Sequence, residues 1–359
     1  MNSIIFNKEF YKGKKILVTG HTGFKGAWLS ELLNYYEADV LGYSLEEEDG
    51  CLYQKIRNRL NVKNVYGDIR DYEQLKKTID GFQPEIVFHL AAFGFIKECF
   101  DNPIKSYSTN VMGTVMLLDA LRDCKSVKSI VVVTTDKVYE NHGDGAVYSE
   151  ADKLGGIGPY SSSKTCCELV VNDYKETYLQ TGNTNIGVAT VRASNVLGGG
   201  DHIESRLIPS ILRAIEKGEE VLLRHPEQTR PWQSVLDALN GYMTVARKLY
   251  NDPQRYSCAW NIGPTEDGIR SVGWMYNKMK EYFSNIESKC VLENGITESK
   301  TLGLDITKSV EMLEWKPYLT IEETIEMLVS FFKEKRCGID EHEICVKQIK
   351  YYLSKSASS

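Results

Sequence analysis

Short apolar runs alternating with helical segments are the feature that most constrains the fold of this chain. Six such runs lie between residues 15 and 192: KILVT (15–19), DVLGY (39–43), VKNVY (62–66), EIVFHL (85–90), SIVVVT (129–134) and IGVATVR (186–192). Runs of this length with little polar alternation are typical of parallel strands covered by helices on both faces. The pattern predicts an α/β fold built on a Rossmann-type, doubly wound parallel sheet.

The pattern changes after Arg192, where the flexible stretch GGGD (198–201) follows the last run. We expect residues 1–192 to form the Rossmann domain. Residues 193–359 are expected to form mainly a smaller, mixed α/β substrate lobe. One later strand near 258–262 is expected to return to the first sheet. A chain of 359 residues has room for this arrangement.

Composition excludes several classes of function. The formal net charge of −6 disfavours general nucleic-acid binding, which usually needs a basic face. The nine cysteines form no CxxC pair and the six histidines no metal-ligand pattern, so we expect reduced thiols, no metal and a cytoplasmic location. We also expect no signal peptide and no membrane association, because no run of about 18 apolar residues is present.

A glycine-rich loop, TGHTGFKG (19–26), joins the first strand to a helix. Gly20 permits a tight turn, Gly23 lets the backbone approach a pyrophosphate, and Gly26 allows close packing of the helix on the strand. The helix N-terminus then offers N–H groups and a positive dipole to phosphates. The loop therefore predicts a dinucleotide site, to which Thr22, Phe24 and Lys25 also contribute.

The end of the second strand bears on the choice between NAD and NADP. Many NAD sites carry an acidic residue there, about 20 residues after the loop. Here the strand ends at Ser44, and the nearest acid is Glu46. No arginine stands beside it to hold a 2′-phosphate, although Lys25 could do so. NAD is favoured, and NADP stays open as the alternative.

Tyr160 and Lys164 form a YxxxK motif after the strand at 129–134. Residues four apart share one face of a helix. A lysine ammonium beside a tyrosine favours the phenolate, which provides a general base or acid for a substrate hydroxyl. YxxxK also occurs by chance as a surface pair, so its position in the chain carries the interpretation.

Together with GDIRD (67–71), HLAA (89–92) and STNVMGT (108–114), these motifs resemble the extended short-chain dehydrogenase/reductase, or NAD-dependent epimerase/dehydratase, family. The resemblance covers nearly the whole chain. It implies a bound nicotinamide cofactor, a nucleotide-sugar substrate, and a catalytic triad of Thr135, Tyr160 and Lys164. The further cofactor contacts that it implies are Asp68, Ile69, Leu90, Ala91 and Ala92.

Four stretches are similar to the CDP-glucose 4,6-dehydratase subgroup: TTDKVYEN (134–141), VRASNVLGGGD (191–201), RLIPSILRA (206–214) and RPWQSVLDALNGY (230–242). The subgroup implies deoxysugar biosynthesis, including that of lipopolysaccharide O-antigen, and a homodimer or homotetramer with paired helices. An arginine suits the diphosphate because its planar fork binds phosphate bidentately; for Arg230 the alternative is a structural salt bridge. The implied substrate contacts are Asn195, Arg206, Leu207, Ile208, Pro209, Arg224 and Arg230.

The reaction that the resemblance implies oxidises C4, eliminates water across C5–C6 and returns hydride to C6. Elimination needs one group to remove the C5 proton and another to protonate the departing 6-hydroxyl. Asp136 and Lys137 follow the triad threonine and are the candidates. Which of them is the acid stays open, as does a purely structural pair at a strand end.

Between Phe93 and Phe100 the chain reads FGFIKECF, where the family pattern is close to QPLVRxSY. Several polar groups beside the expected hexose site are replaced together. A dehydratase for a different nucleotide sugar and a nucleotide-sugar 4-epimerase therefore remain alternatives. A non-catalytic NAD-binding scaffold is a third, which the intact triad disfavours.

Overall fold

The computed structural model describes residues 8–143, 145–182, 184–283, 286–290 and 302–357. Its centre is a parallel sheet of seven strands in the order β11-β7-β5-β4-β1-β2-β3. The strands are β1 (Lys15–Thr19), β2 (Asp39–Ser44), β3 (Val62–Tyr66), β4 (Ile86–His89), β5 (Ser129–Val133), β7 (Gly187–Ala193) and β11 (Ala259–Ile262). The predicted Rossmann-type sheet is confirmed.

Alternate residues of the strands enter two separate cores, one on each face of the sheet. In β5, Val131 and Val133 pack with α2 (Phe24–Tyr35) and α10 (Val235–Asn251). Ile130 and Val132 pack on the opposite face, where the covering helices are α4 (Tyr72–Phe82), α7 (Gly113–Arg122) and α8 (Pro159–Tyr174). Burial on both faces explains why these strands read as continuous apolar runs.

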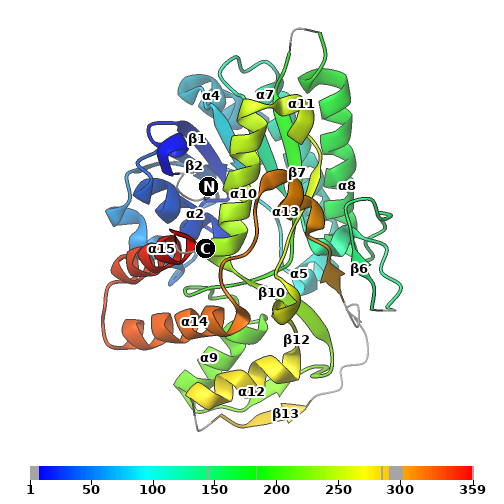
Figure 1. Cartoon of the computed structure of the whole chain (residues 1–359). Helices are drawn as coiled ribbons and strands as arrows, with labels where there is room; N and C mark the ends of the chain where they lie inside the picture. The colour runs from blue at the N-terminus through cyan, green and yellow to red at the C-terminus, as the bar shows by residue number, and fades with distance from the viewer. Residues whose placement is uncertain (1–7, 144, 183, 284–285, 291–301, 358–359) are drawn as a thin grey trace.

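A smaller lobe lies below the carboxyl ends of the strands in Figure 1. It contains a three-stranded sheet of β12 (Ile269–Ser271), β10 (Thr229–Ser234) and β8 (Asn195–Leu197), and a pair of β13 (Ser288–Cys290) with β9 (Val221–Leu223). Its helices, α9 (Leu207–Lys217), α12 (Val272–Tyr282) and α14 (Ile321–Arg336), bury a core of their own.

Several elements from the C-terminal half pack on the Rossmann unit instead. The strand expected near 258–262 is β11, which pairs with β7. Helix α10 covers one face of the sheet, and α15 (Glu341–Ala357) packs on α2 and α3 (Leu52–Ile56), as Figure 1 shows. The sequence interpretation placed α10 and α15 in the lobe, because helical periodicity identifies an apolar face without showing which surface covers it.

Short elements connect these layers. They are η1 (Arg57–Arg59), α5 (Ile96–Asp101), α6 (Pro103–Tyr107), η2 (Ser108–Met112), η3 (Asp136–Val138), β6 (Val147–Tyr148), η4 (Lys175–Leu179), α11 (Pro253–Tyr256), η5 (Glu266–Gly268), β14 (Gly303–Leu304) and α13 (Thr307–Leu313). Within the described ranges, no helix has the length and apolar character needed to cross a bilayer.

Candidate active site

The glycine loop is shaped by two close backbone approaches and one open side. Gly20 has φ +74°, and a Cβ there would lie 2.6 Å from the Ala91 amide nitrogen. A Cβ on Gly26 would lie 2.1 Å from the Gly20 carbonyl oxygen. At Gly23 the nearest heavy atom is 3.5 Å away, so the loop is open on that side. These distances fit the roles predicted for the three glycines.

Helix α2 begins at this open side. Its N-cap is Gly23, and no side chain caps its first-turn N–H groups. Uncapped N–H groups at the positive end of a helix dipole suit a diphosphate. Thr22 and Ser44, both predicted cofactor contacts, lie beside each other at the carboxyl end of β2, with their hydroxyl oxygens 2.8 Å apart. The residues present thus fit a dinucleotide.

The surroundings of Ser44 favour a ribose without a 2′-phosphate. Glu46 is exposed. The carboxylate of the neighbouring Glu47 forms an ion pair with Arg57, a residue that the sequence interpretation did not consider. A carboxylate already neutralises this arginine, so a further phosphate would meet a negative charge.

The other predicted cofactor contacts lie at the carboxyl ends of β3 and β4. Asp68 accepts hydrogen bonds from the side chain of Arg70, and its backbone carbonyl accepts one from the Tyr43 hydroxyl. Ile69 is buried, whereas Leu90 and Ala91 are partly exposed and Ala92 is exposed. This edge of a parallel sheet is where ligands bind in such folds.

The predicted catalytic residues converge where β5 ends. Asp136 is 1% exposed; its Oδ1 accepts a hydrogen bond from Thr135 Oγ1 at 3.0 Å and lies 3.9 Å from Lys137 Nζ. Its second oxygen, Oδ2, has no hydrogen-bond partner among the described residues. Lys164 donates from Nζ to the Val133 carbonyl at 2.9 Å. A buried carboxylate with an unsatisfied oxygen is costly unless a ligand or a proton satisfies it.

Burial dominates the electrostatics of the YxxxK pair. Burial, with the negative charge of Asp136, raises the pKa of Tyr160 to about 12, while a hydrogen bond with Thr135 and the charge of Arg206 oppose this shift. Burial also lowers the pKa of Lys164. The phenol is therefore protonated in the protein alone at neutral pH, and bound ligand charges must stabilise the phenolate.

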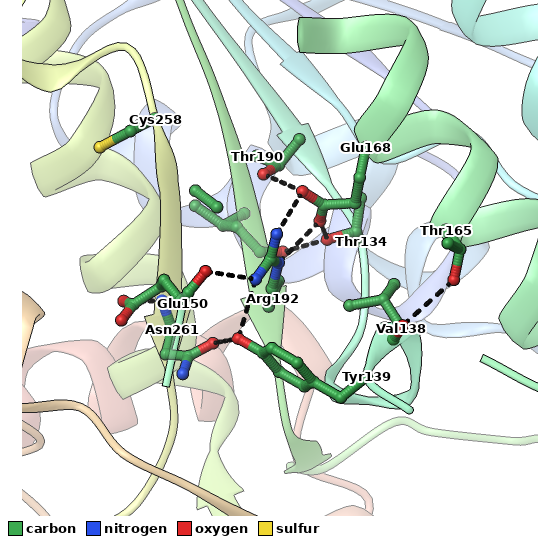
Figure 2. A network of polar contacts seen from close by, with 12 residues as sticks. Thr134, Val138, Tyr139, Glu150, Thr165, Glu168, Thr190, Arg192, Cys258 and Asn261 are labelled. Atoms are coloured by element: carbon green, nitrogen blue, oxygen red, sulfur yellow. Dashed lines mark hydrogen bonds and ion pairs between the residues drawn. The ribbon is translucent and has the colours of Figure 1, made fainter. Parts of the chain in front are cut away.

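A buried ion pair joins helix α8 to strand β7, next to the end of β5 (Figure 2). Arg192 donates to Glu168 through Nε at 3.1 Å and through its terminal nitrogen at 3.0 Å. The same carboxylate accepts from the hydroxyls of Thr134 and Thr190, both at 2.6 Å. Glu168 lies one helical turn after Lys164, so it fixes α8 against β5 and β7.

The network continues to the other end of the catalytic segment. Arg192 donates to the Tyr139 hydroxyl at 3.0 Å, and that hydroxyl donates to Asn261 Oδ1 at 2.6 Å (Figure 2). Thr134 and Tyr139 thus hold the segment that carries Asp136 and Lys137 at both ends. The sequence interpretation missed this network; the spacing of four residues between Lys164 and Glu168 is the only local signal for it.

The unusual stretch after β4 is anchored by Asn110. The Phe93 amide donates to Asn110 Oδ1 at 2.7 Å, and Asn110 Nδ2 donates to Ser163 Oγ of α8 at 2.9 Å. The ring of Phe95 lies 5.8 Å below the guanidinium of Arg206. An aromatic ring of this stretch therefore contacts a predicted substrate residue of the lobe.

The predicted substrate residues occupy several elements of the lobe. Arg206 is the N-cap residue of α9 and forms an ion pair with Asp201 at 2.9 Å. Its positive charge lowers the pKa of Tyr160. Asn195 begins β8, which pairs with β10, the strand of Arg230. The remaining residues are Leu207, partly exposed; Ile208 and Pro209, buried in the first turn of α9; and Arg224, exposed after β9.

Arg230 is 5% exposed and donates to the Gln228 side-chain oxygen at 2.7 Å and to the Thr229 carbonyl at 2.8 Å. These contacts help to fix the orientation of its guanidinium.

Comparison with known proteins identifies the family. The model of the NAD-dependent epimerase/dehydratase family matches residues 16–263. The chain belongs to this family. It is 39% identical to the CDP-glucose 4,6-dehydratase of Salmonella typhimurium over 98% of this chain and 99% of that protein. It is 25% identical to the human dTDP-D-glucose 4,6-dehydratase over 89% and 90% of the two chains.

Solved structures agree on the fold. The dTDP-glucose 4,6-dehydratase of Streptomyces venezuelae with NAD bound superposes with a TM-score of 0.78 at 22% identity, covering 91% of this chain and 99% of that one. The UDP-glucose 4-epimerase of Thermotoga maritima gives 0.76 at 22% identity, over 89% and 99%. The family match confirms the family that the sequence motifs predicted, and it confirms NAD as the predicted cofactor.

Proposed function

We propose that this chain is a CDP-glucose 4,6-dehydratase that forms CDP-4-keto-6-deoxyglucose. The observation that carries the proposal is the Asp136–Lys137 pair beside the triad, in a chain similar to one such enzyme over nearly its full length. A 4-epimerase needs the triad but no elimination pair.

Bound NAD supplies the acceptor for the C4 hydride and later returns that hydride to C6. Tyr160 takes the proton of the 4-hydroxyl as hydride leaves C4, and Thr135 holds the phenol by a hydrogen bond. Lys164, held by the Val133 carbonyl, supplies positive charge beside the cofactor site. The 4-keto group then acidifies the C5 proton.

We assign the acid to Asp136 and the base to Lys137. The carboxyl of Asp136 is buried, and its Oδ2 has no partner, so a proton on this oxygen can be directed at a substrate hydroxyl. Lys137 is more exposed, with 19% of its side chain accessible, so its amine can exchange the C5 proton with solvent. The C5 proton passes to Lys137, and the 6-hydroxyl leaves as water with the proton of Asp136. Hydride then returns to C6, and Lys137 gives C5 a proton that has exchanged with solvent, which completes the balance.

The test is incubation with CDP-glucose and NAD in deuterated water, followed by mass spectrometry and NMR. The expected product is the 4-keto-6-deoxy sugar with deuterium at C5. Asp136→Asn should reduce dehydration by about 100-fold or more while C4 oxidation persists. Asp101→Asn, a change at an exposed residue of α5, is the control.

A C4-epimerised product without deuterium at C5 would replace the proposal with a 4-epimerase. A 4-keto-6-deoxy product from another nucleotide sugar, in preference to CDP-glucose, would retain the reaction and change the substrate. NAD binding without turnover of any nucleotide sugar would indicate a scaffold.

We further propose a homodimer through the exposed face of α6, η2 and α8. Ile104 is 85% exposed and Leu169 62%, and Tyr107 and Met112 are also exposed on this face. Contiguous apolar residues of this kind mark interaction surfaces. Leu169→Glu should produce monomers in light scattering, whereas Leu222→Glu, at an exposed leucine of the lobe, should leave the oligomer unchanged.

We also propose that the lobe of residues 193–359 binds the nucleotide and that the enzyme works in a reducing compartment in deoxysugar biosynthesis, such as that of O-antigen. All nine cysteines are free thiols, which supports the compartment.

A further inference from the structure

Lys25 has an unusual position for a residue of a glycine-rich loop. It lies in the first turn of α2, and its Nζ is 3.5 Å from the hydroxyl of Tyr242, a fully buried residue of α10. Among the described residues, this hydroxyl is its only partner within hydrogen-bond distance, and no carboxylate lies within ion-pair distance. A partly buried lysine without a counter-charge at ion-pair distance is costly to the protein alone.

The groups that face Lys25 come from four elements. Lys164 of α8 and Arg206 before α9 add positive charge, Asp136 of η3 adds one negative charge, and Tyr242 adds a hydroxyl. Burial, with the two cations, lowers the pKa of Lys25 to about 7, and Asp136 opposes this shift.

Part of this positive charge is compensated, because Asp201 forms an ion pair with Arg206. Of the charged groups that act on Lys25, Lys164 and Asp136 remain, so together with Lys25 they are two lysines and one buried carboxylate. This excess of positive charge suits an anionic ligand.

The direction of the side chain identifies which anion it meets. Asp136 and Lys164 belong to the edge formed by β5, which lies two strands from β1, whereas Ser44 ends β2 on the other side of β1. Lys25 therefore points away from Ser44, which favours the diphosphate over a 2′-phosphate as its partner. Its backbone N–H is in the uncapped first turn of α2, and side chains on a helix lean toward its N-terminus.

We propose that the Lys25 side chain binds the diphosphate of the dinucleotide cofactor, next to the catalytic residues. This inference rests on the proposed function only through its cofactor, and it is independent of the sugar. The amine of Lys25 must be protonated to pair with the diphosphate. Above neutral pH the protein therefore takes up protons when the cofactor binds. The substrate also carries a diphosphate, and the experiment separates the two sources.

The test is titration calorimetry of the purified protein with NAD, ADP-ribose, AMP and CDP at pH 8. In Lys25→Met, the affinity for NAD and for ADP-ribose should fall by about 10- to 100-fold, because a charge-assisted hydrogen bond is lost. The affinity for AMP, which lacks a diphosphate, should stay unchanged. Lys25→Arg should retain most of the affinity, and Lys217→Met, at an exposed residue of α9, is the control.

Proton uptake is the second readout. In two buffers of different ionisation enthalpy, the wild-type protein should take up a fraction of a proton on binding ADP-ribose at pH 8, and Lys25→Met should take up less. Unchanged affinity for ADP-ribose in Lys25→Met would overturn the proposal, even if turnover falls. A loss confined to CDP would overturn it in favour of the substrate diphosphate. Circular dichroism of each variant distinguishes either result from misfolding.

Discussion

Replacing Glu168 by glutamine tests whether the buried network fixes the catalytic segment. Arg192 and Glu168 expose only 5% and 4% of their side chains. Glutamine keeps the shape of the side chain and removes its charge. The Arg192 guanidinium then has only neutral acceptors, among them the hydroxyl oxygen of Tyr139 and the backbone carbonyl oxygen of Glu150. The NH₂ group of the glutamine side chain is also a hydrogen-bond donor at a position where a carboxylate oxygen of Glu168 accepts hydrogen bonds.

Leaving one charge of a buried pair uncompensated costs about 3–5 kcal/mol. An unfolding entropy of about 2.1 cal/mol/K per residue gives roughly 0.75 kcal/mol per kelvin for 359 residues. Glu168→Gln should therefore lower the melting temperature by about 4–7 °C. The double variant Glu168→Met/Arg192→Met removes both charges and should be less destabilised than Glu168→Gln, because no charge remains unpaired.

The assay is calorimetric and urea unfolding of both variants and the wild type. Glu140→Gln is the matched control, because the partner of Glu140, Lys153, has 78% of its side chain exposed, and this pair contributes about 0–1 kcal/mol. A loss in Glu168→Gln no larger than in Glu140→Gln would refute the reasoning. In that case neutral hydrogen bonds would stabilise the protein as well as the Arg192–Glu168 ion pair does.

Three further predictions concern the loop, its histidine and the unusual stretch after β4. Gly26→Ala should lower stability and abolish NAD binding in calorimetry, because its Cβ would meet backbone atoms at 2.1 Å; Gly23→Ala, with 3.5 Å available, should fold normally and bind NAD more weakly. Burial lowers the pKa of His21 to about 4 from 6.5. The unfolded chain therefore binds more protons between these values, so stability should fall by about 2 kcal/mol from pH 7 to pH 5 in urea unfolding, and less in His21→Asn. Asn110→Ala should release the Phe93 backbone and raise KM for the nucleotide sugar more than it lowers stability; unchanged steady-state kinetics would contradict this role.

Local sequence determined most of the secondary structure and the outline of the site. The strands β1 and β3 begin and end at the predicted residues, and the glycine loop, YxxxK and the Asp136–Lys137 pair lie at one edge of the sheet. These features were predictable because strand length, turn chemistry and helical spacing are properties of neighbouring residues.

The tertiary structure decided which surfaces and charges meet. Only the packed chain shows that α10 and α15 cover the Rossmann unit, that Arg192 neutralises Glu168, and that Lys25 faces Tyr242. Each of these contacts joins residues far apart in the sequence, or depends on the direction of a long side chain. Periodicity specifies that a face is apolar or that a charge is present, whereas its partner is selected by the packing of the whole molecule.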